Sequence, residues 1–135
     1  METVDNFIEQ WQEQDPGTRR AFMELMEHLR NMEGVNLDFI ARPGVSYSLR
    51  PRHPGQHKRP LFAMLDVIDD DPDARWLSVC FYEDMITDPD DMGDMIPGGL
   101  LGSDGYCFDL DEYDQEGVDY LKQRLTQAYE KASAR

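Results

Sequence analysis

The chain has 135 residues, 40% of them hydrophobic, and a formal net charge of −15 at neutral pH. This length suits a single domain, residues 1–135, with its own hydrophobic core, so neither a metal nor a set of disulfides is needed to explain folding. The negative net charge argues against a general nucleic-acid binder, because it repels phosphate. No apolar run approaches the roughly 20 residues of a membrane span, and the first residues lack a basic, hydrophobic leader, so we expect a cytoplasmic protein.

Two helices are expected at the N-terminus. Residues 5–14 place three large apolar side chains at helical spacing and predict a short helix within an N-terminal extension, residues 1–17. A second helix is predicted to begin at Asp15 or Thr18 and to end before Gly34. Its apolar positions follow the spacing of a stripe that faces a core: they are Phe22, Leu25, Met26, Leu29 and Met32.

Alternating apolar side chains predict the strands. In the most regular run Leu77, Val79 and Phe81 share one face, which is the two-residue period of a strand. Proline, glycine and aspartate clusters separate this run from its neighbours. Five strands are expected, at residues 37–42, 45–49, 61–68, 76–82 and 105–110.

These elements predict an α+β fold with a mostly antiparallel five-stranded sheet. A third helix is expected over residues 114–132, where apolar side chains again recur at helical spacing. The two N-terminal helices and this C-terminal helix are expected to pack on one face of the sheet, because the strands have a polar face. Residues 83–104 are predicted to be an irregular acidic crossing that contains a short capped helix at residues 88–92.

The two cysteines, Cys80 and Cys107, both fall in strand-like runs. In a chain without an export signal we favour buried thiols over a disulfide. A disulfide is the alternative, because neighbouring strands could bring the two sulfurs together.

Two stretches resemble a known group of small domains. Residues 39–49 (FIARPGVSYSL) and residues 120–132 (YLKQRLTQAYEKA) are similar in layout to YdhG-like and YjbR-like domains, over the region from about Thr18 to Ala132. The resemblance implies a helix-covered antiparallel sheet. It also implies an iron-carrier activity as one alternative, since one YdhG-like member resembles frataxin in that role, although most members have no assigned activity.

Charge is unevenly distributed along the chain. Residues 39–65 contain five cations and no acid, whereas residues 66–94 contain eleven acids and one base. The basic hairpin loop could dock an anion, with an aromatic neighbour for a base; it could contact the acidic crossing of another copy or of a partner; or the two regions could screen each other within one molecule. The candidate binding residues of this surface are Tyr47, Arg50, Arg52, His53, His57, Lys58 and Arg59.

The acidic crossing supplies two further candidates. Its methionines and leucines suggest an interface strap or lid, since methionine-rich surfaces adapt to partners, and the alternative is a simple cover for the sheet edge. The candidates are Met92, Met95, Leu100 and Leu101 for the strap, and Asp88, Asp90, Asp91 and Asp94 for a surface site that binds Ca²⁺ or Fe²⁺ through carboxylate oxygens.

No motif for catalysis is present in the sequence. No serine lies in a nucleophile elbow, no cysteine has an adjacent base, and the two loop histidines are separated by proline and glycine, which excludes the helical spacing of a zincin. Glu83 and Asp84 could pair as acid and base or serve as solubilising charges at a strand end. We therefore expect a binding module without a cofactor, whose partner is a protein or a second copy; the alternatives are a metal carrier and a hydrolase of unrecognised type.

Overall fold

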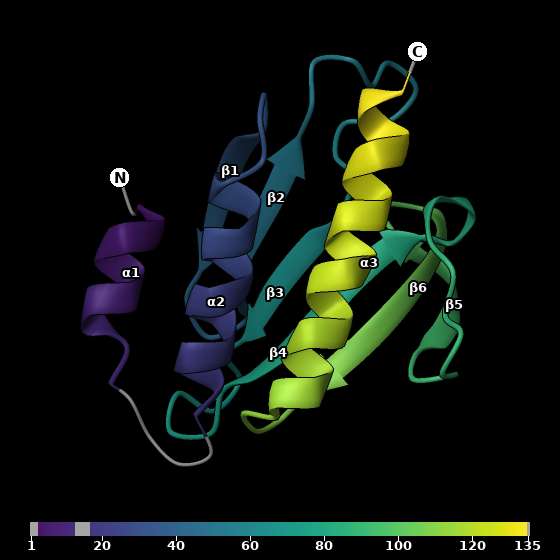
Figure 1. Cartoon of the computed structure of the whole chain (residues 1–135). Helices are drawn as coiled ribbons and strands as arrows, with labels where there is room; N and C mark the ends of the chain where they lie inside the picture. Colours follow the sequence, from purple (N-terminus) through teal and green to yellow (C-terminus); the bar gives the residue numbers. More distant parts are fainter. Residues whose placement is uncertain (1–2, 13–16, 135) are drawn as a thin grey trace.

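Three α-helices lie on one face of a six-stranded antiparallel sheet in the described part of the chain (Figure 1). The computed structural model describes residues 3–12 and 17–134. The spatial order of the strands is β1-β2-β3-β4-β6-β5, so the first four form a meander. The elements are α1 (Val4–Gln10), α2 (Thr18–Arg30), β1 (Asn36–Arg42), β2 (Ser46–Arg52), β3 (Met64–Ile68), β4 (Trp76–Tyr82), the short 3-10 helix η1 (Glu83–Met85), β5 (Asp94–Leu100), β6 (Ser103–Leu110) and α3 (Gln115–Ser133).

The predicted α+β class and the placement of two N-terminal helices and one C-terminal helix are confirmed. The prediction of five strands is wrong, because the crossing 83–104 contains a sixth. Strand β5 pairs antiparallel with β6 and occupies the edge of the sheet, with an irregular register between Ile96 and Leu100. An edge strand accommodates proline because one side of its backbone has no partner, and this explains how Pro97 is tolerated there.

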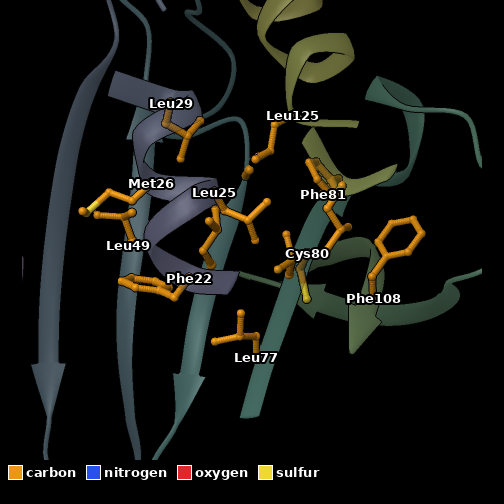
Figure 2. Close-up of a cluster of buried hydrophobic side chains, with 14 of the residues drawn as sticks. Phe22, Leu25, Met26, Leu29, Leu49, Leu77, Cys80, Phe81, Phe108 and Leu125 are labelled. Atoms are coloured by element: carbon orange, nitrogen blue, oxygen red, sulfur yellow. The ribbon is translucent and has the colours of Figure 1, made fainter. Parts of the chain in front are cut away.

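The core lies between the sheet and the helices α2 and α3. Four residues of the predicted stripe, Phe22, Leu25, Met26 and Leu29, are buried in one cluster with Leu77 and Phe81 of β4 and Leu125 of α3 (Figure 2). The fifth, Met32, lies beyond the end of α2 and is only partly buried. Burying a large apolar side chain contributes roughly 1.5–3 kcal/mol, so this layer dominates the stability of the fold. The amphipathic spacing in the sequence therefore identifies the core face of both helices correctly.

Apolar side chains of helix α1 pack into the hydrophobic core. The hydroxyl of Thr3 caps the helix by accepting a hydrogen bond from the Asn6 backbone at 3.1 Å. The Phe7 ring stacks on the Tyr47 ring with 4.0 Å between centroids, and the Arg75 guanidinium lies over Phe7 at 5.2 Å. Helix α2 has Gly17 as its N-cap; the predicted start at Asp15 lies outside the described residues.

The two cysteines form a disulfide, so the prediction of buried thiols is wrong. Cys80 of β4 and Cys107 of β6 are direct partners in the antiparallel register, and their Cα atoms are 4.1 Å apart. The register of the two strands places the sulfurs side by side, and this register could not be read from either strand alone.

The predicted short helix at residues 88–92 is also wrong, because these residues form a turn. The Asp91 backbone amide donates to the Asp88 carbonyl at 3.1 Å, and Asp91 has a positive φ of 51°, which ends any helical path. No helix in the described part of the chain is long and apolar enough to cross a membrane.

Candidate functional site: the basic end

The loop between β2 and β3 lies beside the C-terminal end of α3, at the top of Figure 1. We call this region the basic end and define it as Arg52, residues 53–60 and Lys131. It groups the cations of one continuous segment, the end of β2 and the loop that follows it, with Lys131 in the last turn of α3, which is distant in the sequence.

His53 fixes the shape of the loop. Its ring Nδ1 accepts a hydrogen bond from the Gly55 backbone at 2.9 Å, and its carbonyl accepts one from the Gln56 backbone at 3.0 Å. The ring also packs edge-on against Tyr129 of α3, with 5.6 Å between centroids. His53 thus ties the loop to α3 and positions the residues that follow it.

Arg59 joins the loop to the acidic crossing. Its guanidinium donates to both carboxylate oxygens of Asp84, at 2.5 and 3.1 Å, and lies over the Tyr82 ring at 4.1 Å. The hydrogen bonds between the two side chains raise the pKa of Arg59 and lower the pKa of Asp84. Lys131 donates to the Asp84 backbone carbonyl at 3.3 Å. The basic loop and the acidic crossing therefore contact each other within one molecule at this point, as expected if the two regions screen each other's charge.

The other cations of the hairpin differ in their pairing. Arg52 forms an ion pair with Asp38 of β1 at 2.5 Å, and Arg50 donates to Ser48 at 2.9 Å on the sheet surface, away from the loop. His57 and Lys58 are exposed and make no hydrogen bond or ion pair within the described residues. These two side chains are therefore available to a ligand.

Two cavities border the loop and share its residues 56–59 as a wall. One, of about 530 Å³, lies between the loop and the ends of β1 and β2, and the other, of about 640 Å³, lies between the loop, η1 and α3. Lys58 and Arg59 line both cavities, and Lys131 and Asp84 line the larger one. In the shared wall, the side-chain amide oxygen Oε1 of Gln56 is buried without a hydrogen-bond partner in the described residues. The basic end is thus a pair of open hollows on either side of the loop, whose shared wall carries the cations Lys58 and Arg59.

Asp88 holds the acidic crossing in place. Burial raises its pKa, but hydrogen bonds from the Tyr120 hydroxyl, the Gly93 and Met92 amides and the Tyr106 hydroxyl outweigh this effect and lower the pKa to about 2. The Asp88 carboxylate therefore has a structural role, in which it ties the crossing to α3 and β6.

The predicted metal residues are not gathered into a site. Asp88 is occupied by the four donors just described, and in the described residues no group of three or more histidine, cysteine, aspartate or glutamate side chains could hold a metal ion. Asp90, Asp91 and Asp94 are exposed along the crossing. The two loop histidines, predicted as partner- or anion-binding residues, differ in their surroundings, because His53 is hydrogen-bonded to Gly55 and His57 is exposed.

The structure divides the other predicted contact residues. Met92, Met95 and Leu101 are exposed on the crossing, but Leu100 is completely buried in the core. Tyr47 is buried under α1 on the helix-covered face of the sheet, so it does not border the basic loop. Loop and crossing meet at Asp84 and Met85, through Arg59 and Gln56, and not at the exposed methionines.

The sequence does not indicate that Asp84 and Lys131 lie at the basic end. The sequence signal for both is weak, because one follows a strand and the other ends a helix, and only the fold brings them to the loop. Comparisons of the chain with protein-family models, with curated proteins and with solved structures found no match.

Proposed function

We propose that this chain is a protein-binding module and that the basic end docks an acidic segment of a partner protein. The observation that carries this proposal is the loop wall shared by two open cavities, which presents Lys58 exposed and without an ion pair in the described residues, on a chain whose net charge is −15. A wall with a cavity on each side suits an extended peptide that places carboxylates in both cavities.

The charges close to the loop, rather than the net charge of the chain, decide whether an acidic segment is attracted to it. At physiological ionic strength the Debye length is about 8 Å, so a docking segment responds to the cations beside it and little to the acids on the rest of the chain. Arg52 and Arg59 are already neutralised by Asp38 and Asp84, which leaves Lys58 as the cation that a partner carboxylate meets first.

The affinity is expected to be modest and dependent on salt. An exposed ion pair contributes at most about 1 kcal/mol, so a few such contacts produce weak, reversible binding. No specific observation favours the metal-carrier or hydrolase alternatives: Asp84 is committed to Arg59, and the aspartates of the crossing do not converge.

A fluorescence anisotropy titration tests the proposal. The probe is a labelled peptide with the sequence of residues 83–94, which carries aspartates and glutamate without any base. We expect saturable binding that weakens as salt rises from about 50 to about 500 mM, and no binding of the same peptide with amides in place of its carboxylates. Equal binding of the charged and uncharged peptides would contradict the proposal.

The matched variants are Lys58→Glu in the loop after β2 and Arg42→Glu at the end of β1, which make the same change of charge. Arg42 pairs in register with Ser46, the first residue of β2, about 20 Å from Arg52 at 3.4 Å per residue. Lys58→Glu should weaken peptide binding roughly five- to tenfold, since it removes one contact and adds a repulsion, whereas Arg42→Glu should leave it unchanged. An equal loss in both variants would show that the peptide responds only to net charge.

A further inference from the structure

The face of the sheet opposite the helices is not covered by any element in the described part of the chain (Figure 1). Side chains alternate along a strand, and Leu77, Val79 and Phe81 point to the helices, so Trp76, Ser78 and Cys80 belong to the other face. We call this other side the open face. The register extends it across all six strands.

The centre of the open face is polar but already removed from water. Ser46 and Ser48 are buried, because Arg42 and Arg50 lie across them and donate to their hydroxyls at 3.3 and 2.9 Å. Beside them, burial raises the pKa of Asp66, and the hydrogen bond from Ser48 only partly opposes this shift. The two serine hydroxyls therefore add no desolvation cost to a contact, and a surface that covers this region meets the guanidinium groups of Arg42 and Arg50.

Charge is divided between the two halves of the open face. The β1–β2 half carries Arg42, Arg50 and Arg52 against the single acid Asp38, while strands β5 and β6 contain no cation. Asp94 and Asp109 form no ion pair within the described residues, and burial together with the neighbouring acids Asp94 and Asp111 raises the pKa of Asp109. The face is thus positive on one side and negative on the other.

We propose that the open face binds the open face of a second copy of this chain. A twofold axis parallel to the strands, between β3 and β4, would place β2 opposite the partner's β6 and β1 opposite the partner's β5. The arginine half of each copy then faces the aspartate half of the other, so the same contact between opposite charges occurs twice in the dimer. A twofold axis perpendicular to the strands would instead place β1 against the partner's β1, with like charges opposed.

The size of the face is sufficient for such a contact. Six strands spaced at about 4.8 Å, with about six residues each at about 3.4 Å, present roughly 500 Å² per copy, or roughly 1,000 Å² in total. This value is at the lower limit for a specific interface. Ile40 and Ile96, which are 40% and 44% exposed near the two edges, add apolar contact area. A reversible dimer is therefore expected.

Charge reversal tests this arrangement with two single variants, Arg50→Glu and Asp109→Arg. Sedimentation equilibrium from about 1 µM to about 1 mM should show a dimer for the unmodified chain. Each variant alone should dimerise at least tenfold more weakly, because like charges then face each other at both contacts. An equimolar mixture of the two variants should recover the original affinity, since every reversed residue then meets a residue of opposite charge.

Recovery in the mixture also shows that both variants are folded. Should Arg50→Glu fail to fold by circular dichroism, Arg42→Glu replaces it, because this exposed residue belongs to the same positive half. A chain that remains monomeric up to about 1 mM, single variants that dimerise normally, or a mixture that fails to recover would each overturn the proposal. Lys58→Glu, which tests the basic end, should leave dimerisation unchanged, so the two proposals fail separately.

Discussion

Reduction of the Cys80–Cys107 disulfide should lower the stability of the fold without changing its architecture. The bond joins residues 27 apart in the sequence, so it closes a loop of that size in the unfolded chain. The chain-entropy relation gives about 12 cal/mol/K for such a loop, or about 3.5 kcal/mol at 25 °C. With an unfolding entropy of about 2.1 cal/mol/K per residue, this loss corresponds to a melting temperature lower by roughly 12 °C.

Thermal unfolding followed by circular dichroism, with and without a reductant, measures this difference. Alkylation in denaturant followed by mass spectrometry should find no free thiol before reduction and two after it. The matched control is the double variant Cys80→Ala/Cys107→Ala, whose melting temperature should not respond to the reductant. Thiols that are alkylated without reduction, or equal melting temperatures in both conditions, would refute the pairing of β4 with β6 through these residues.

Two further predictions concern the core and the acidic crossing. Leu25→Ala, at a completely buried position of α2, should destabilise the fold by about 3 kcal/mol in urea unfolding, whereas Met23→Ala, at an exposed position of the same helix, should change stability by less than about 0.5 kcal/mol. The pKa of Asp88 is about 2 in the fold and 3.8 ordinarily, so its ionised form stabilises the protein above about pH 4. This contribution to stability should be lost as the pH falls through 2, and Asp88→Asn should lack that pH dependence. The same variant should lower the pKa of Tyr106 from about 12 towards 10 in an ultraviolet titration, since the hydrogen bond to Asp88 is the main cause of the elevated value, and an unchanged Tyr106 titration would contradict the assigned contact.

The elements that could be predicted are those whose own side chains decide their structure. Helix α2 and strand β4 each carry a regular apolar pattern, and the structure buries that pattern in both. Strand β5 differs because its sequence, with Pro97, Gly98 and Gly99, has little intrinsic tendency to extend. Its conformation depends on pairing with β6 at the sheet edge, which local patterns do not report.

The candidate site was predicted only where its residues are neighbours in the sequence. The cations of the loop stand out because no acid interrupts them, but Asp84 and Lys131 join them only through the tertiary structure. Tyr47 is close to the loop in the sequence, but its ring is buried against Phe7 of α1. It shares a strand face with the fully buried Leu49, and this alternation already places it on the core side of the sheet.

Nuclear magnetic resonance tests the proposed docking surface most directly. In a ¹⁵N-labelled sample titrated with the unlabelled peptide of residues 83–94, the amide signals that shift should be those of Arg52, His53, residues 55–59, Asp84 and the last turn of α3. Shifts of this pattern in the unmodified chain, and their loss in Lys58→Glu, are the predicted result. Shifts that fall on α1 and α2, or a spectrum that does not respond to the peptide, would contradict the assignment of the basic end as a protein-binding surface.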